Sequence, residues 1–290
     1  MRVADLFCGM GGFSEGFKQA DYDIVYANDI EKDCIDIFKL NNPETEVVCK
    51  DVKEIKEVPK VDLVIGSPPC QPFSIASYAK NYDTTLVKEF FRLVKLFEAK
   101  YWIMENVIYL NKLIDEKGVT LDSADFGVPQ KRKRKFFSNI LLRPEKTFNV
   151  NVKDALRLKK GSYLLDSRMA HFNVNGREPI SINKPAPTLT TKCNGFHIIE
   201  PSNKFIFETN TAKSMREWIA KNEKKPVHIR RISARECLIL QGFDVNYKFP
   251  DNIKEGMKCK YIGNSVCPPV SNAIAKNLSN DIKGSINSWL

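Results

Sequence analysis

Hydrophobic and polar positions along the first 145 residues follow a repeating order of short apolar runs and amphipathic segments. Apolar runs that stop at glycine, proline or an acid are typical of buried strands, and apolar positions three and four residues apart are typical of helices. The expected strands are 3–7, 24–27, 46–49, 61–65 and 101–104, and the expected helices are 13–20, 32–40 and 86–97. This alternation predicts an α/β fold, with a mostly parallel sheet and helices on both of its faces.

The pattern changes between about residues 161 and 249, where the apolar runs shorten and Asn, Lys and Pro become frequent. Short pieces such as 188–190 and 205–207 still favour strands, and 270–278 has the spacing of a helix. We therefore expect residues 1–160 to form one domain and residues 161–250 to form a smaller, irregular, strand-rich one. Residues 251–290 are expected to return to the first domain and complete it.

Composition narrows the partners and the compartment. The 45 Lys and Arg residues exceed the 35 Asp and Glu residues, and the net charge of +10 favours a polyanion such as nucleic acid. The eight cysteines include no Cys-x-x-Cys pair and the three histidines are scattered, so we predict no metal site. No apolar run is long enough to cross a membrane and an acid at position 5 interrupts any signal-peptide core, so a cytoplasmic protein is expected.

A glycine-rich segment, residues 5–13, lies between the first expected strand and the first expected helix. Glycines there let the backbone approach a ligand beside a helix N-terminus, although a plain tight turn would look the same. A dinucleotide fingerprint needs a glycine where this sequence has Ser14, so an NAD site is disfavoured. Asp29, at the end of the second strand, is placed to accept hydrogen bonds from the ribose hydroxyls of a nucleoside. Ile30 could pack on its adenine ring, and Asp51-Val52 could meet the other edge.

Cys70 and Glu105 each follow an expected parallel strand, so their side chains could converge over one cleft. Prolines before Cys70 hold its thiol on a stiff loop. A thiol and a carboxyl group together suit methylation of cytosine at carbon 5. Attack of a thiolate on carbon 6 makes carbon 5 nucleophilic, and a carboxyl group at ring nitrogen 3 stabilises the adduct. Taken alone, Glu105 could equally be a capping or ion-pair carboxylate.

A basic run, residues 130–135, precedes the apolar pair Phe136-Phe137. Alternation along a strand puts Arg132 and Arg134 on one face. From there they could reach the cytosine carbonyl oxygen, the target phosphate or the carboxylate of Glu105. A solvated basic edge strand is the alternative interpretation.

Six segments in this order resemble the motifs of the cytosine-5 DNA methyltransferases, and together they span residues 5–270. They are Asp5-Leu6-Phe7-x-Gly9-x-Gly11-Gly12, Pro68-Pro69-Cys70-Gln71, Glu105-Asn106-Val107, Gln130-x-Arg132-x-Arg134, the run from Arg230 to Cys237 continuing to Gln241-Gly242-Phe243, and Gly263-Asn264-Ser265-Val266. The resemblance implies a Rossmann-like S-adenosylmethionine-dependent methyltransferase fold built from both chain ends, with a target-recognition domain between them. It implies S-adenosylmethionine as the methyl donor and a specific duplex DNA sequence as the substrate, with the target cytosine flipped out of the stack.

The resemblance also assigns roles to residues. The catalytic residues would be Cys70 as nucleophile, with Glu105, Arg132 and Arg134. The cofactor would rest on Phe7, Gly9, Gly11, Gly12, Asp29, Ile30, Asp51, Val52, Pro69, Asn264, Ser265 and Val266. DNA would be contacted by Ser74, Thr188, Leu189, Arg230, Arg231 and Arg235.

Two departures from the family pattern have structural consequences. Many members carry Asp-x-Arg-Gly in the loop that closes over DNA, whereas residues 83–86 read Asp-Thr-Thr-Leu. The stretch between Val107 and Gln130 is short and has room for one brief helix at 109–116 and one strand at 119–121. We therefore expect the sheet to be trimmed on that side.

Alternatives from other classes have weaker support. A catalytically inactive DNA-binding relative would be expected to lack Cys70 or Glu105, and both are present. A tRNA methyltransferase of the same architecture would carry a Cys-Phe-Thr signature, and the nearest string, residues 193–196, reads Cys-Asn-Gly-Phe. An enzyme that methylates an exocyclic amine would have an aromatic residue at the position of Cys70. A monomer with a cognate restriction endonuclease as functional partner is expected, and the recognition sequence cannot be inferred from the chain.

Overall fold

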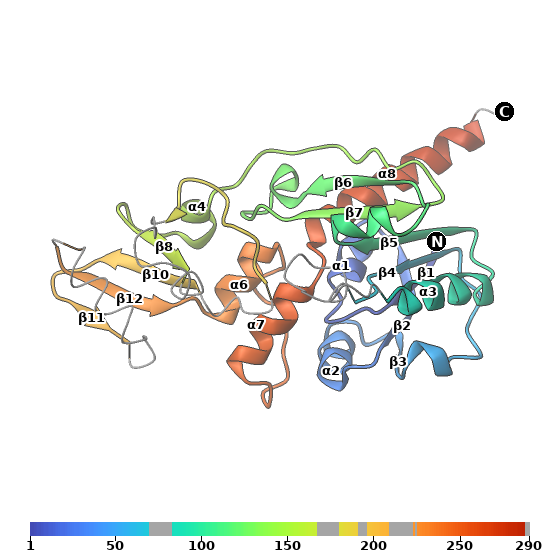
Figure 1. The fold of residues 1–290 in the computed structure, drawn as a ribbon, viewed down its shortest axis with the longest axis horizontal. Helices are drawn as coiled ribbons and strands as arrows, with labels where there is room; N and C mark the ends of the chain where they lie inside the picture. The colour runs from blue at the N-terminus through green and yellow to red at the C-terminus, as the bar shows by residue number, and fades with distance from the viewer. Residues whose placement is uncertain (70–82, 167–179, 191–195, 209–222, 224, 288–290) are drawn as a thin grey trace.

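Two sheets lie at opposite ends of an elongated molecule, with helices α6 and α7 between them (Figure 1). The computed structural model describes residues 1–69, 83–166, 180–190, 196–208, 223 and 225–287. The larger sheet contains seven strands in the order β3-β2-β1-β4-β5-β7-β6, and the smaller contains five in the order β11-β12-β10-β8-β9. The predicted class, a Rossmann-like α/β fold with a smaller strand-rich part, is confirmed.

The larger sheet is parallel except for β7, which runs antiparallel to both of its neighbours. Its strands are β1 (Arg2–Leu6), β2 (Asp23–Asp29), β3 (Glu46–Cys49), β4 (Leu63–Gly66), β5 (Tyr101–Asn106), β6 (Gly118–Asp122) and β7 (Lys133–Ser138). The helices that accompany it are α1 (Gly12–Lys18), α2 (Lys32–Asn41), α3 (Thr85–Leu96) and α8 (Pro268–Asn287), with short 3-10 turns η1 (Val52–Glu54), η3 (Ile108–Lys112) and η4 (Ser123–Phe126).

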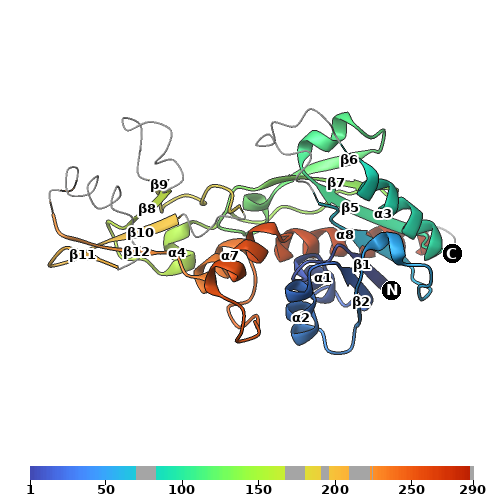
Figure 2. The ribbon, with the colours of Figure 1, turned by 60° about the horizontal axis from the view of Figure 1, so that its bottom comes forward.

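Helices cover both faces of this sheet because successive strand residues point to opposite sides (Figure 2). Ile65 and Ile103 belong to the core that contains Phe13 of α1 and Ile274 of α8. Their neighbours on the strands, such as Met104, belong to the second core, which is formed with α3. The near-continuous apolar runs seen in the sequence therefore reflect strands buried on both faces.

The far side of the larger sheet is complete, so the expectation of a trimmed sheet was wrong. Strand β6 is present at Gly118–Asp122, at the place predicted from the sequence. The connection between β5 and β6 is the part that is short. It contains η3 (Ile108–Lys112) in place of the helix expected over 109–116. This connection crosses from β5 to β6, which run parallel on either side of β7.

The smaller sheet is largely antiparallel, with only β11 and β12 running parallel. Its strands are β8 (Tyr163–Asp166), β9 (Ile180–Ser181), β10 (Phe196–Pro201), β11 (Ile206–Phe207) and β12 (Val227–Arg231), and α4 (Val152–Leu156), α6 (Ala234–Gln241) and α7 (Glu255–Asn264) pack beside it. The strand expected at 188–190 is irregular instead. The backbone N–H of Leu189 donates to the side chain of Gln130 rather than to a neighbouring strand.

The end of the chain returns to the larger sheet. Helix α8 lies directly against α1 at Gly16, where an added Cβ would sit 1.9 Å from Ser271 Oγ. The backbone oxygen of Pro268 would lie 2.3 Å from the same position, so only glycine permits this contact. Within the described part of the chain, no helix combines the length and the apolar character needed to cross a membrane.

Candidate active site

The site is built at the edge of the larger sheet where the parallel strands end. Leu6 of β1 pairs with Gly66 of β4, and Gly66 pairs with Met104 of β5. The glycine loop and residues 67–69 therefore leave the sheet at one edge, and Glu105 lies near the same end of β5. Open α/β sheets bind ligands at this carboxyl edge.

The glycine loop is held in shape by Asp29 at the end of β2. Gly9 N donates to Asp29 Oδ2 at 2.8 Å, and Glu31 N donates to Asp29 Oδ1 at 2.9 Å. Gly9 and Gly11 have φ of +54° and +96°, which L side chains rarely adopt. No atom lies within 4 Å of a Cβ built on Gly9, so this stretch of backbone faces open space.

The carboxylate oxygens of Asp29 can accept further hydrogen bonds in addition to those from Gly9 and Glu31. Burial raises the pKa of its carboxyl group, and the backbone N–H donors of Glu31 and Gly9 oppose the shift. Each oxygen receives one of these donors, which leaves lone pairs for further hydroxyls. Ile30, the next residue, is 69% exposed, an apolar surface suited to an aromatic ring. Asp51 is half-buried and caps η1 by accepting from Lys53 N, whereas Val52 is buried.

The second wall of the loop comes from the far end of the chain. A Cβ on Gly12 would lie 2.2 Å from both Ser265 Oγ and Val266 O, so these segments touch through a glycine. Ser265 and Val266 are buried, and the neighbouring Asn264 is exposed. Of the glycine-loop residues, Phe7 is half-buried with φ of +55°.

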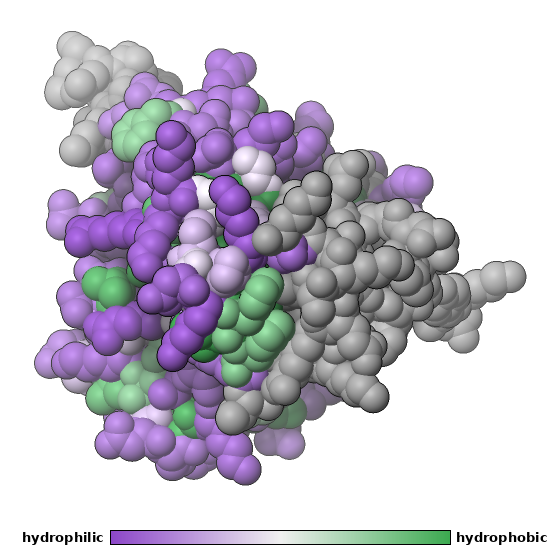
Figure 3. All heavy atoms as spheres, turned by 90° about the vertical axis from the view of Figure 1, so that its left-hand side faces the viewer, coloured by the Kyte–Doolittle hydropathy of each residue, from purple (hydrophilic) through white to green (hydrophobic). Residues whose placement is uncertain are grey.

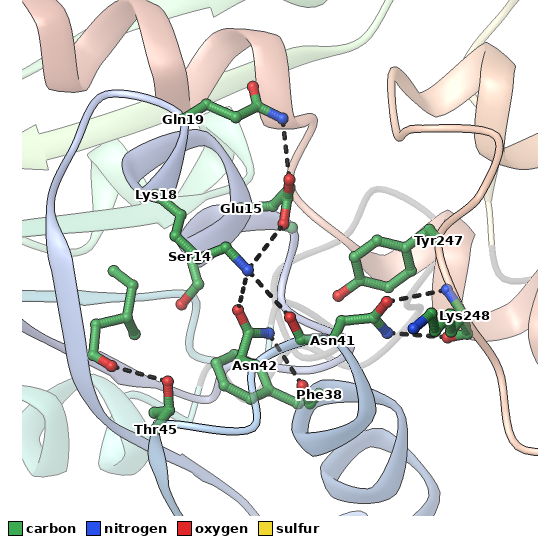
Figure 4. Close-up of polar contacts among 12 residues, drawn as sticks. Ser14, Glu15, Lys18, Gln19, Phe38, Asn41, Asn42, Thr45, Tyr247 and Lys248 are labelled. Atoms are coloured by element: carbon green, nitrogen blue, oxygen red, sulfur yellow. Dashed lines mark hydrogen bonds and ion pairs between the residues drawn. The ribbon is translucent and has the colours of Figure 1, made fainter.

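A polar network fastens this region to the segment that follows α6 (Figure 4). The hydroxyl of Tyr247 donates to the carbonyl of Met10 within the glycine loop. Asn41 exchanges two hydrogen bonds with the Lys248 backbone, donating from Nδ2 and accepting at Oδ1, both at 2.9 Å. Lys18 Nζ donates to Asn42 Oδ1 at 2.8 Å and so joins α1 to the end of α2.

The loop that carries the predicted nucleophile is fixed at its base. Cys70 and Ser74 lie outside the described residues. Pro68 and Pro69 precede Cys70, and Asn106 Nδ2 donates to Pro68 O at 3.1 Å. This bond ties the start of the Cys70 loop to the end of β5, one residue beyond the predicted catalytic Glu105. Pro69 is exposed.

Glu105 is paired with the second arginine of the basic run. Arg134 Nε lies 3.2 Å from Glu105 Oε1, and both side chains are largely buried. Arg132, Arg134 and Glu105 line one small cavity together with Ser123 and Cys267. The common face expected for the two arginines is therefore present, and Arg134 reaches the carboxylate.

Cys267 is a second thiol at this cavity. Burial raises its pKa to about 11, against the opposing effect of Arg132 and Arg134. A thiol with that pKa stays protonated at neutral pH and is a poor nucleophile. The geometry therefore gives Cys267 a packing role.

Arg132 connects the site to the smaller sheet's region. Its Nη1 donates to Leu189 O at 2.9 Å, and Thr188 Oγ1 donates to Lys131 O at 2.7 Å. Leu189 is buried and Thr188 is half-buried. The Thr-Leu pair thus docks on the backbone and side chains of the basic run.

The arginines of the segment that begins at Arg230 differ in their surroundings. Arg230 makes a bidentate ion pair with Glu236, with both N–O distances at 2.8 Å. Burial works against ionisation of Glu236, but hydrogen bonds from Arg230 and Ser233 lower its pKa. Arg231 is half-buried and Arg235 is exposed. Arg230 is therefore committed to an internal contact between β12 and α6.

Two buried side chains of importance were not singled out by sequence reasoning. Gln130 and Gln241 are both 0% exposed and hydrogen-bonded to each other at 2.8 Å. They stand inside two of the motifs, at the first position of Gln-x-Arg-x-Arg and of Gln-Gly-Phe. The signal in the sequence is weak: Gln130 is an uncharged residue at the start of a basic run, and Gln241 is a polar residue that follows an apolar one.

The seven-stranded order, the glycine loop at the end of β1 and the acid at the end of β2 define an α/β methyltransferase domain. The family model for C-5 cytosine-specific DNA methylases matches residues 1–119 and 117–280. The chain belongs to this family, and its cofactor is S-adenosylmethionine.

Relatives and solved structures agree with this assignment. The chain is 28% identical to the type II methyltransferase M.NgoPII of Neisseria gonorrhoeae over 339 aligned residues, covering 100% of this chain and 96% of that protein. It is 36% identical to M.DdeI of Desulfomicrobium norvegicum over 167 residues, covering 47% of this chain and 40% of that one. The Entamoeba histolytica methyltransferase EhMeth has the same fold, with a TM-score of 0.67, 17% identity, and coverage of 97% and 98%.

The residues around the glycine loop fit this cofactor. The open space beside Gly9 would let the cofactor approach the backbone of the loop. The lone pairs of Asp29 suit the ribose hydroxyls, and the exposed side chain of Ile30 suits the adenine ring. None of these three residues carries a positive charge, which suits a cofactor with a sulfonium cation.

Proposed function

We propose that this chain methylates carbon 5 of a cytosine in a specific duplex DNA sequence through a covalent adduct with Cys70. The observation that carries the proposal is the hydrogen bond from Asn106 to the carbonyl of Pro68. It ties the base of the Cys70 loop to the strand end that bears Glu105. This link between the two segments supports the proposal that the Cys70 thiolate and the Glu105 carboxyl group act on one pyrimidine ring.

The roles follow from the chemistry of cytosine. The Cys70 thiolate adds to carbon 6, and the electron pair of the 5,6 double bond becomes available at carbon 5. Glu105 holds a proton at ring nitrogen 3, where negative charge would otherwise build up. S-adenosylmethionine supplies the methyl group that carbon 5 takes up. A base then removes the proton from carbon 5, the double bond re-forms and the thiolate leaves.

Arg134 positions the carboxyl group of Glu105 through their ion pair. Arg132 is held to Leu189 by its Nη1, and we propose that its guanidinium acts on the cytosine carbonyl oxygen or the target phosphate. Because both arginines line the same cavity as Glu105, they supply positive charge where the adduct is polarised.

Duplex DNA is the proposed partner, with the target base flipped into the site. Thr188, Arg231, Arg235 and Ser74 are the proposed contacts, whereas Arg230 is engaged with Glu236. The described surface at the smaller-sheet end is largely hydrophilic, as a polar partner requires (Figure 3). We further propose residues 161–250 as the target-recognition domain, and a monomer that works in the cytoplasm beside a restriction endonuclease. The type II methyltransferases among its relatives support that setting.

A duplex oligonucleotide with 5-fluorocytosine at the target position tests the covalent step. The target is first located by bisulfite sequencing of DNA from cells that express the protein. Addition of Cys70 and methyl transfer can proceed on the fluorinated base, but fluorine cannot leave as a cation. We expect a protein–DNA adduct that survives denaturation and requires S-adenosylmethionine.

Cys267→Ala is the matched control, because it removes the other thiol near Glu105 and should leave the adduct intact. Cys70→Ala should give none. Absence of the adduct with wild-type protein at a site shown to be methylated would exclude the Cys70 mechanism. Methyl incorporation into tRNA but not into duplex DNA would overturn the substrate assignment.

Exchange of residues 161–229 for the matching region of a relative with another target tests the proposed recognition domain. The catalytic motifs lie outside this interval, so the chimera should be active at the relative's site. An active chimera that still methylates the original site would place specificity elsewhere.

A further inference from the structure

Gln130 and Gln241 form a buried hydrogen-bonded relay across the middle of the molecule. Gln130 Oε1 accepts from Leu189 N at 2.7 Å, and its Nε2 donates to Gln241 Oε1 at 2.8 Å and to Leu240 O at 3.1 Å. Gln241 Nε2 donates to Ser265 O at 2.6 Å. The relay thus connects four segments that are far apart in the sequence.

The polarity of the relay is fixed from both ends. Leu189 N–H is a donor only, so it must meet the oxygen of the Gln130 amide. The carbonyls of Leu240 and Ser265 are acceptors only, so they must meet amide nitrogens. Only one orientation of each amide satisfies all of these groups. A buried amide left unmatched costs about 1–3 kcal/mol, so the two side chains hold one another in place.

The two ends of the relay lie in functionally different parts of the molecule. At one end, Leu189 belongs to the proposed recognition region, and its carbonyl accepts from the predicted catalytic Arg132. At the other end, Ser265 lies against Gly12 of the cofactor loop, where even a Cβ would clash at 2.2 Å. A shift of the Leu189 backbone would therefore displace both Arg132 and, through the two glutamines, Ser265 beside the cofactor loop.

We propose that Gln130 and Gln241 are positioning residues that couple target binding to cofactor binding. The proposal rests on the proposed function, in which duplex DNA is the substrate. Binding of the target duplex fixes the recognition region, the relay fixes Ser265 against the glycine loop, and the cofactor pocket is completed. By thermodynamic linkage, cofactor binding strengthens target binding by the same factor.

The test measures this factor directly. S-adenosylhomocysteine, the demethylated product, is titrated into wild-type protein in the absence and in the presence of saturating target duplex. Allosteric coupling of ordinary size predicts a ratio of dissociation constants of at least about fivefold. Gln130→Met and Gln241→Met keep side-chain length and remove the amide. We expect the ratio to fall to about one in each, while the dissociation constant without DNA stays within about threefold of wild type, as for an uncoupled ligand site.

Gln19→Met is the matched control, because Gln19 is an exposed glutamine bonded only within α1, to Glu15. It should retain the wild-type ratio. The double variant Gln130→Met/Gln241→Met should match either single variant, since each cuts the same relay. If Gln241→Met fails to fold, Gln130→Met decides, because it leaves the bond from Gln241 to Ser265 in place.

The coupling would be overturned if target duplex left the S-adenosylhomocysteine dissociation constant of wild-type protein unchanged. It would also be overturned if Gln130→Met and Gln241→Met kept the wild-type ratio of dissociation constants. Loss of S-adenosylhomocysteine binding without DNA by folded Gln130→Met would also overturn it, since the relay would then merely shape the pocket. Failure of the proposed function is distinguishable: wild-type protein would then form no adduct with 5-fluorocytosine duplex. An active wild type with unchanged variants contradicts the relay alone.

Discussion

The two sheets use their polar groups in opposite ways. At the edge of the larger sheet, Asp29 and Glu105 keep acceptor oxygens beside open space or a cavity. Beside the smaller sheet, charges are satisfied within the chain, as with Arg230 and Glu236 or with Tyr163 and Glu223. The first arrangement leaves acceptor groups for the proposed chemistry, and the second ties the charged side chains to one another.

The joint between the two regions includes several hydrogen bonds to backbone atoms on the smaller-sheet side. Lys131 N donates to Ala186 O and Ala186 N donates to Pro129 O, both at 2.8 Å. Leu189 adds its own N–H and C=O. Backbone groups are present in every sequence, so these hydrogen bonds do not depend on the side chains of the smaller sheet. The buried apolar cluster that joins Met10 and Ile37 to Leu164 and Phe196 does depend on them.

The largest effect should come from replacing Cys70, with replacement of Cys267, a thiol in the Glu105 cavity, as the comparison. Cys70→Ala should lower methyl transfer by about 10⁴-fold or more, as loss of a nucleophile does in other covalent enzymes. Cys267→Ala should keep kcat close to wild type because its pKa of about 11 leaves it protonated. Single-turnover transfer of a radiolabelled methyl group to target duplex gives both values. Equal losses in the two variants would contradict the assignment of the nucleophile.

Glu105→Gln should have the next largest effect. The amide cannot hold the proton at ring nitrogen 3 as a carboxyl group can, so kcat should fall by about 10²–10⁴-fold. Arg134 also loses its ion-pair partner. Binding of S-adenosylhomocysteine in the absence of DNA should be unchanged, and the 5-fluorocytosine adduct should form slowly. An adduct formed at the wild-type rate would remove Glu105 from the mechanism.

The larger sheet could be predicted almost strand by strand, and the smaller one could not. Strands buried on both faces give continuous apolar runs, and β3 was predicted with both ends correct. The segment 188–190 has strand-like residues, but the N–H of Leu189 donates to the side chain of Gln130 instead of to a neighbouring strand. Propensity is a local property, and this partner lies 59 positions away in the sequence.

The site follows the same division. Arg132 and Arg134 were predicted to share one face of a strand, and they line one cavity together with Glu105. The carboxylate of Glu105 was one of the predicted partners and pairs with Arg134. The contact of Arg132 with the Leu189 carbonyl was not predicted, because alternation fixes the side of a strand and not the distant contact. The buried pair of Gln130 and Gln241 depends on segments 111 positions apart, which no spacing rule reveals.

Asp5, beneath the glycine loop, should make the larger sheet's stability depend on pH. Burial raises the pKa of its carboxyl group to about 7, with hydrogen bonds from Ser14 opposing. Its Oδ2 accepts from Ser14 Oγ at 2.6 Å, while the buried Oδ1 has no partner. The folded state therefore binds the proton more tightly than the unfolded chain. The stability contribution is fully present below about pH 4 and is lost as pH rises through 7.

Asp5→Asn should remove this dependence, because the amide is neutral at every pH. The free energy of unfolding of the variant minus that of wild type should rise by about 2–3 kcal/mol between pH 5 and 8. Urea denaturation at several pH values measures the difference, and other titrating groups cancel in it. A difference that stays flat across this range would mean that Asp5 is ionised throughout.

The smallest effects should separate two arginines of the recognition side, Arg230 and Arg235. Arg235 is exposed, so Arg235→Met should weaken duplex binding and reduce the slope of log affinity against log salt by about one. Arg230 is held by Glu236 at 2.8 Å, so Arg230→Met should leave that slope unchanged. It should instead lower the free energy of unfolding by about 1–2 kcal/mol, because Glu236 loses its partner. Fluorescence anisotropy across a salt series, with urea denaturation of each variant, tests both. A reduced slope in Arg230→Met would mean that the ion pair with Glu236 opens and Arg230 contacts phosphate. The contrast between the two sheets, in which charges beside the smaller sheet are paired within the chain, would then not hold for Arg230.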